Sequence, residues 1–241
     1  MLTLLAAAAG GLDAVSFLGL GQVLVAAMTG NTVLLGIALG HADLHATLRS
    51  AVSLASFVAG AMVGAAIVDR DERDSLWSPA VTWALALELA IIAVLALAWH
   101  LVEGRAGATV DYRYPLIVAA GIAMGVQSAA AHRIGVPGVA TTYVSGTLTS
   151  LAARLVGCLR ARGDAARSDQ ARKAGAPWLA PCVWIAYGAG ALFAAAAHYH
   201  WPSIALHGIR WPSVALLLPI SVIAVVVLLA AIVYRRSPAP A

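Results

Sequence analysis

Charged residues are scarce in this chain: they make up 11% of its 241 residues, whereas apolar residues make up 61%. Ordinary soluble domains carry about 25% charged residues, and the mean hydropathy here reaches +0.87. The shortage of charge excludes a typical soluble domain. The composition instead predicts a protein that crosses a membrane several times.

Cysteines and common catalytic motifs are also rare or missing. The two cysteines, Cys158 and Cys182, have no CxxC spacing and indicate neither a disulfide framework nor a metal site. The histidines of "HADLH" and "HYHW" do not complete a set of four metal ligands. No GxSxG, HExxH, Walker A or Rossmann motif occurs. We therefore expect a protein that is not an enzyme and that holds no metal or cofactor.

Long apolar runs dominate what is present. A helix of about 20 apolar residues spans the hydrocarbon core of a bilayer. The N-terminal run has no positively charged start, so we expect it to be a retained helix rather than a signal peptide. The sequence predicts an all-α membrane protein in which residues 1–241 form a single membrane domain. Its eight expected segments are 2–20, 22–40, 50–68, 79–102, 115–131, 139–159, 177–197 and 212–234.

The basic residues predict the orientation, because Lys and Arg near segment ends stay on the cytoplasmic side. With eight crossings, one side holds eleven of them: Arg49, Arg105, Arg113, Arg154, Arg160, Arg162, Arg167, Arg172, Lys173, Arg235 and Arg236. The other side holds four: Arg70, Arg73, Arg133 and Arg210. We therefore expect both termini and the 160–176 loop in the cytoplasm. That basic loop is more typical of a solvated, positive-inside loop than of a nucleic-acid binder.

Two blocks of the chain resemble each other. "GGLDAVSFLGLGQVLVAAMTGNTVLLG" aligns with "MGVQSAAAHRIGVPGVATTYVSGTLTSLA", which places Asp13 over Gln127 and Thr29-Gly30-Asn31 over Ser145-Gly146-Thr147. The alignment predicts a duplication, with one half over residues 1–102 and the other over 114–236. Eight crossings would make the halves run in the same direction. An odd number of crossings would instead make an inverted repeat, which is common in secondary transporters.

Each block carries a hydroxyl-Gly-polar triplet inside an apolar run. Gly30 and Gly146 are poor helix formers, and their neighbours favour helix N-caps. The pattern predicts broken helices that begin inside the membrane, with free N–H groups able to hold an anion or a polar solute. The alternative is close helix packing, which uses the same small residues.

A few polar side chains inside the apolar runs are candidates for a site. Asp13 lies midway along the first segment, where a carboxylate usually faces the protein interior. Glu88 lies in the fourth segment, at a shallower position. Asp13 and Glu88 are the expected coupling residues, and His132 and Arg133 fit interfacial anchors or a charged gate. The expected substrate-binding residues are Asp13, Thr29, Gly30, Asn31, Gln127, Ser128, Thr142, Ser145, Gly146 and Thr147.

The two aligned blocks resemble the YoaK family of bacterial multi-pass membrane proteins, and the similarity covers nearly the whole chain. The resemblance implies a membrane protein with a domain of unknown function and supplies no catalytic residues. Family members often carry Asn where this chain has Ala27 and Ser128. The resemblance therefore implies location and fold, not a substrate.

Three functions fit the sequence. The first is a small secondary transporter or permease in the bacterial inner membrane, with a midplane site between two repeats. Its partners would be the lipid bilayer, a small polar or anionic solute and a coupling proton or cation, with no nucleic acid. The second is a non-transporting scaffold or accessory subunit, and the third is an intramembrane enzyme, for which no nucleophile-base pair is found. A homo-oligomer is left open.

Overall fold

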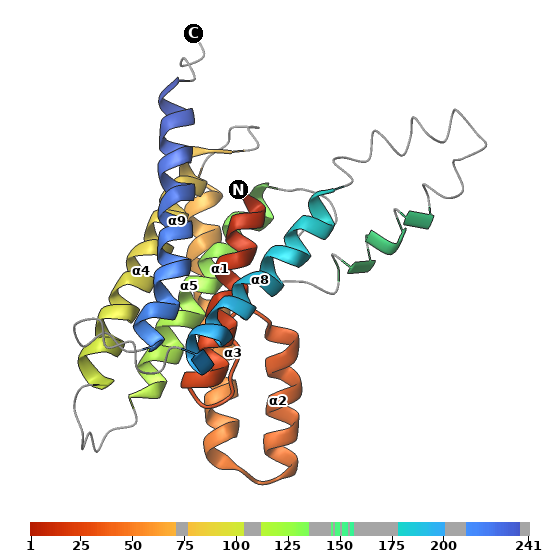
Figure 1. The fold of residues 1–241 in the computed structure, drawn as a ribbon, viewed down its shortest axis with the longest axis vertical. Helices are drawn as coiled ribbons and strands as arrows, with labels where there is room; N and C mark the ends of the chain where they lie inside the picture. The colour runs from red at the N-terminus through yellow and green to blue at the C-terminus, as the bar shows by residue number, and fades with distance from the viewer. Residues whose placement is uncertain are drawn as a thin grey trace.

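The structure, a computed structural model, describes residues 1–70, 77–103, 112–134, 146, 148–149, 151–153, 155–156, 178–200 and 211–236. The regular elements of this part of the chain are all helical (Figure 1), which confirms the all-α membrane fold. The helices are α1 (Leu2–Gly19), α2 (Met28–Gly40), α3 (Leu44–Val68), α4 (Pro79–Glu103), α5 (Arg113–Ile134), α8 (Leu179–His200) and α9 (Trp211–Arg236).

Six of these helices, all except α2, are long and apolar enough to cross a membrane. They coincide with six of the eight expected segments. The expected crossing over 22–40 is wrong, because α2 begins only at Met28 and has 13 residues, too few to span about 30 Å. The expected segment 139–159 lies largely outside the described residues.

The crossing helices form one bundle with apolar surfaces both inside and outside. α3 packs on α5, α1 packs on α8, and α4 lies against both α5 and α9. Buried residues recur every three or four positions along the inner face of α4, as a helix requires: Leu85, Glu88, Ile92 and Leu95. Exposed side chains such as Leu97, Leu192 and Leu228 are apolar too, as expected for surfaces that face lipid.

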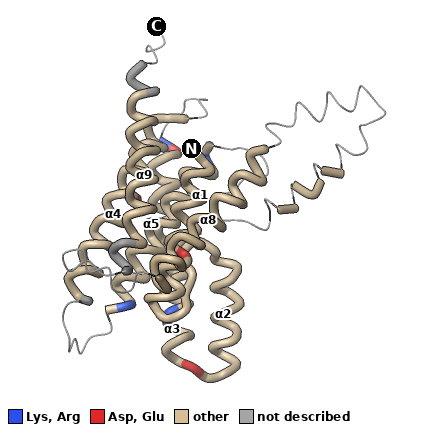
Figure 2. Tube along the Cα trace, in the orientation of Figure 1, with Lys and Arg blue, Asp and Glu red and all other residues tan. Residues whose placement is uncertain are grey.

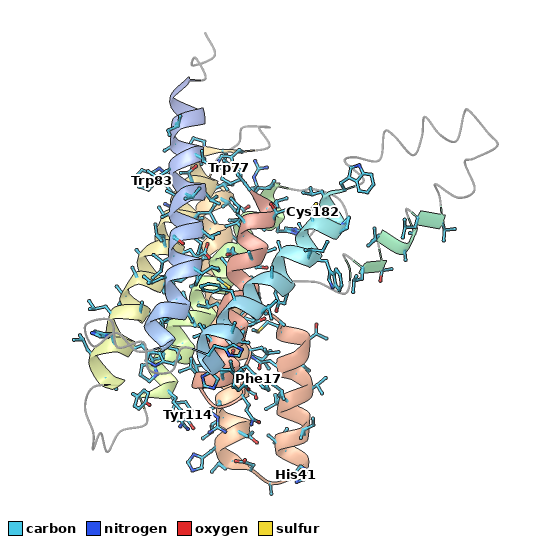
Figure 3. The ribbon with its side chains drawn as sticks, viewed as in Figure 1. Phe17, His41, Trp77, Trp83, Tyr114 and Cys182 are labelled. Atoms are coloured by element: carbon cyan, nitrogen blue, oxygen red, sulfur yellow. The ribbon has the colours of Figure 1, made fainter. Side chains whose placement is uncertain are left out.

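Charges and interfacial aromatics lie toward the ends of the helices. In Figure 2 most of the length of each helix carries no charge, and most charged residues lie near the helix ends; the exceptions include Asp13, inside α1, and Glu88, in the middle of α4. Trp77 and Tyr114 lie at opposite ends of the bundle in Figure 3, where aromatic residues meet the membrane surface. The bundle is therefore divided into an apolar middle and two polar faces.

Glycines bring two pairs of helices into close contact. A Cβ atom on Gly60 of α3 would lie against the backbone of Ile122 in α5, and one on Gly125 would lie against the backbone of Phe57. In the second pair, a Cβ on Gly10 of α1 would meet the backbone of Tyr187 in α8. The α3–α5 and α1–α8 crossings thus have backbone-to-backbone contact of the kind that small residues allow in membranes.

The helix directions decide how the two halves of the chain are related. Arg49, near the start of α3, donates to the carbonyl of Gly21 just beyond α1, so α1 ends where α3 begins. α3 and α5 run in the same direction, because Gly121 lies against Ser56 while Arg133 and Val68, further along, line one cavity. Therefore α1 and α5 run in opposite directions, unlike the same-direction halves that eight crossings would make. Within the described residues, three crossing helices come from the first half (α1, α3 and α4) and three from the second (α5, α8 and α9).

Two names follow from this arrangement. The end of the bundle where α1 begins and α9 ends is called the termini face, and the other end, with the α2–α3 turn, is called the opposite face (Figure 1).

Candidate functional site around Asp13

The chain turns back on itself between α1 and α2. Gly21 and Gln22 both adopt positive φ angles, of 89° and 63°, which lets the backbone reverse after the last turn of α1. Residues 20–27, here called the returning segment, then run back alongside α1. They bring the start of α2 close to Asp13, which lies within the membrane-crossing helix.

Asp13 is the centre of this arrangement and is only 3% exposed. Its Oδ1 accepts the backbone N–H groups of Val25 and Ala26, each at 2.7 Å, and its Oδ2 accepts that of Ala27 at 3.0 Å. The hydroxyl of Tyr187, from α8, donates to the same Oδ2. An ionised carboxylate only accepts hydrogen bonds and has about four acceptor positions. Four donors therefore satisfy it completely, which offsets the cost of burying its charge.

Side chains from two other helices hold the same segment. The Asn31 side chain forms two bonds with the backbone of Leu24, accepting its N–H at 3.0 Å and donating to its carbonyl at 2.5 Å. Ser53 of α3 donates to that carbonyl as well, at 2.6 Å. The Arg49 bond to Gly21 measures 3.1 Å. The returning segment, which has no regular secondary structure, thus has its polar groups paired by α1, α2 and α3, as a break in the membrane requires.

The structure corrects the expected chemistry of the first triplet. α2 does begin beside it, but its N-cap is Ala27, which makes no side-chain cap bond. Thr29 is exposed, and Asn31 turns back to Leu24 instead of capping the helix. The N–H groups just before α2 meet Asp13, so the anion at this break is the chain's own carboxylate. Gly30, half-buried, stands beside the Leu24 side chain.

Gln127 and Ser128, which are neighbours in α5, do not line the same cavity. Gln127 is fully buried in α5, and its amide donates to the carbonyl of Leu5 in α1 at 3.2 Å. Ser128, next in the chain, is half-buried and lines a cavity of about 560 Å³ between α3 and α5. The mouth of this cavity, at the termini face, holds Asp69, His132 and Arg133.

Glu88 lies deeper than expected. It is 0% exposed, on the inner face of α4 between Leu85 and Ile92, and does not reach an interface. Within the described residues, neither of its carboxyl oxygens has a hydrogen-bond partner. A buried carboxyl group in this condition costs stability, which makes Glu88 the second unusual acid of the bundle.

The remaining expected residues lie in the second triplet region. Thr142, Ser145 and Thr147 are outside the described residues, and Gly146 is described as helical and half-buried. The expectation that the two triplets face each other therefore stays a prediction.

Tyr187 and Ser53 were not among the expected site residues. Tyr187 is 174 positions from Asp13 in the chain, too far for any local pattern to pair them. The clue was a lone Tyr among small residues in "AYGAG". Among the described residues, no group of His, Cys, Asp and Glu could hold a metal ion.

Comparison with known proteins gives the family. A family profile described as "Protein of unknown function (DUF1275)" matches residues 1–229. The chain is 40% identical over 152 residues to the UPF0700 transmembrane protein YoaK of Bacillus subtilis (strain 168), a match that covers 63% of this chain and 64% of that protein. No solved structure matches. The chain therefore belongs to the DUF1275 family, the YoaK family of transmembrane proteins suggested by its two aligned blocks.

Proposed function

We propose that this protein is a small secondary transporter or permease of the bacterial plasma membrane, built as an inverted repeat, that moves a small polar or anionic solute. The packing of the helices supports the repeat. α3 packs on α5 as α8 packs on α1, and α4 lies against α5 as α9 lies against α1. Inverted repeats of this kind allow one half to move against the other around a central site.

The buried positions of the two halves also match. Ser53, Ser56, Gly60 and Gly64 are buried in the middle of α3. Three of them have buried counterparts at the same intervals in α8, Val183, Gly190 and Ala194, whereas Ala186, the counterpart of Ser56, is half-buried. The same holds for α4 and α9, in which Leu85, Ile92 and Leu95 correspond to Leu216, Ile223 and Val226. Glu88 then corresponds to Pro219, the proline inside α9.

One observation carries the proposal: the returning segment ends on a buried carboxylate at membrane depth. Asp13 needs all of its acceptor positions for Val25, Ala26, Ala27 and Tyr187. A proton on Asp13 would turn one acceptor position into a donor, so either a backbone N–H group would have to leave or the Tyr187 hydroxyl would have to reverse its bond and accept. Proton binding is thereby linked to a rearrangement of the bonds between Asp13, Tyr187 and the returning segment, which is how a coupling residue would act.

Flux measurements on purified protein in liposomes test the proposal. Under an imposed pH gradient, a panel of small carboxylates, phosphate and amino acids should include a solute that the wild type moves. Asp13→Asn should lose this flux, and Asp43→Asn, which changes an exposed acid at the start of α3 to another good N-cap residue, should keep it. A folded wild type that moves no solute would favour the scaffold, in which the glycine crossings and the saturated Asp13 are purely structural.

The folded state of the variant must be checked in the same samples. Three backbone N–H groups face Asp13, and an amide in its place would point its own NH2 group at one of these donors. We therefore expect Asp13→Asn to lower the free energy of unfolding by about 2 to 4 kcal/mol, as measured by thermal unfolding in detergent. Tyr187→Phe removes one donor and leaves the carboxylate, so it keeps the flux test informative if the amide variant unfolds.

A further inference from the structure

The two close crossings differ at equivalent positions. In the proposed repeat Asp13 corresponds to Gln127, and "AYGAG" of α8 falls on "SFVAG" of α3, so Tyr187 corresponds to Phe57. The Tyr187 hydroxyl bonds to Asp13 across the α1–α8 crossing. Phe57 has no hydroxyl and cannot form the matching bond to Gln127 across the α3–α5 crossing. The α1–α8 crossing is therefore held by a hydrogen bond that the α3–α5 crossing lacks.

The two crossings also differ in how closely their helices pack. Between α3 and α5 the cavity of about 560 Å³ runs toward the termini face along Ala65, Ser128 and Ala129. The equivalent place between α1 and α8, toward the opposite face, holds Ala195, Ala14 and Val15. Val15 is fully buried, whereas its counterpart Ala129 is half-buried and lines the cavity. At this position the α1–α8 crossing is more closely packed than the α3–α5 crossing, while Ala14 and Ala195 are half-buried, as are their counterparts Ser128 and Ala65.

We propose that the cavity between α3 and α5 is one of two alternating solute chambers, and that a second chamber opens between α1 and α8 at the opposite face when Tyr187 releases Asp13. This proposal rests on the proposed transport function and adds the site and its gate to it. In the structure described here the termini-face chamber is open and the opposite-face chamber is closed. The gate is the hydroxyl-carboxylate bond, and the glycine contacts of both crossings provide the surfaces that slide.

The lining of the open chamber indicates the class of solute. Arg133 and His132, in the last turn of α5, and the Ser128 hydroxyl carry hydrogen-bond donors that suit a carboxylate. Asp69 adds one acidic group to the same lining, and Ala65 and Val68 form an apolar wall. The equivalents of His132 and Arg133 on the other side are the uncharged Leu18 and Gly19. A small organic acid with one carboxylate and a short alkyl chain matches this lining.

Accessibility of single cysteines tests the gate without any solute. In a background with Cys158 and Cys182 replaced by Ala, Ala65→Cys reports on the open chamber and Ala195→Cys on the equivalent place between α1 and α8. Each is labelled with a membrane-impermeant maleimide in right-side-out and inside-out vesicles. Tyr187→Phe is then added to each reporter, and Tyr114→Phe, the same chemical change on α5, serves as the control.

The expected result is reciprocal. Removing a hydrogen bond to a buried carboxylate shifts a two-state equilibrium roughly tenfold or more. Tyr187→Phe should therefore raise the labelling of Ala195→Cys from the opposite face about tenfold and lower that of Ala65→Cys from the termini face. Tyr114→Phe should change neither. Unchanged rates, or a rise at both reporters, would overturn the proposal.

Two further arms cover the remaining outcomes. Phe57→Tyr supplies the missing hydroxyl beside Gln127 and should lower the labelling of Ala65→Cys, so the gate can be tested even if Tyr187→Phe does not fold.

Propionate, as the probe acid, should slow the labelling of Ala65→Cys in the background that is otherwise wild type; no protection would overturn the solute class. Reciprocal labelling without flux would contradict the transport function alone, and flux without reciprocal labelling would contradict the gate alone.

Discussion

At the scale of single residues, the two buried acids of this bundle are in opposite conditions. Asp13 has four donors around two oxygens, and Glu88 has none within the described residues. The apolar setting of each was readable from the sequence, but the partners were not. The donors to Asp13 come from a segment twelve to fourteen residues later and from α8. Because all four partners are donors, a carboxylate suits position 13 better than an amide, which carries donors of its own.

Replacing Glu88 should make the protein more stable. A buried carboxyl without partners costs about 1 to 3 kcal/mol, and Met has a similar shape without polar atoms. We expect Glu88→Met to raise the free energy of unfolding by that amount, measured by thermal unfolding in detergent. Leu85→Met, one turn away on the same buried face, is the control and should change stability by less than about 1.5 kcal/mol.

The same variant separates a structural acid from a coupling one. If Glu88 carries a coupling proton, Glu88→Met should be more stable than wild type and yet lose proton-linked flux. A gain of stability with unchanged flux would show that Glu88 is not a coupling residue. A less stable protein would mean that the carboxyl group has a stabilising partner after all.

At the scale of elements, two glycines of α8 should respond very differently to the same change. A Cβ atom on Gly190 would lie against the backbone carbonyl of Ala7 in α1, whereas a Cβ on Gly188 would have nothing within 4 Å. Gly190→Ala should therefore force α1 and α8 apart and cost about 1 to 3 kcal/mol.

Gly188→Ala is the matched control. It should be neutral, or stabilising by up to about 1 kcal/mol, because Ala favours helix over Gly. Thermal unfolding of the two variants side by side makes the comparison. Equal effects at both positions would contradict the close α1–α8 contact, on which the gate also depends.

Long apolar helices were predictable and the break before α2 was only partly so. The six crossing helices follow from runs of apolar residues that match the bilayer thickness. A break at the first triplet followed from Gly30 and its polar neighbours, and α2 does begin there. The groups that hold this break were not predicted, because Asp13, Tyr187 and Ser53 lie on other helices and come together only in the folded chain. A local pattern of helix caps does not show such contacts.

At the scale of the whole molecule, a single short helix changes the relation between the halves. Counting 22–40 as a crossing gives an even number per half and parallel halves. α2 is only 13 residues long and follows a segment that returns alongside α1, so α1, α2 and the returning segment together cross once. This one difference reverses the directions of α3, α4 and α5, whereas α9 still ends at the face where α1 begins. The duplication itself rests on the alignment and on the matching burial, and stays a prediction.

The charge asymmetry survives the new count of crossings, which is the basis of the last prediction. If the six helices found in the described residues are the crossings, sequence order assigns Arg49, Arg105, Arg113 and Arg210 to the opposite face and the other eleven of the 15 basic residues to the termini face. Three residues change sides in each direction, so the ratio is the same as for eight crossings. Positive charge therefore still favours a cytoplasmic termini face and a cytoplasmic 160–176 loop.

Two single cysteines in the background without Cys158 and Cys182 check this orientation in intact cells. His41→Cys, in the exposed turn between α2 and α3, should be labelled by an impermeant maleimide from outside. Ser168→Cys, at a position outside the described residues, should be labelled only after the cells are opened. The opposite labelling pattern would reverse the orientation and, with it, the side on which the chamber between α3 and α5 opens. The mouth of this chamber, with Arg133 and His132, would then collect organic anions from outside the cell rather than from the cytoplasm.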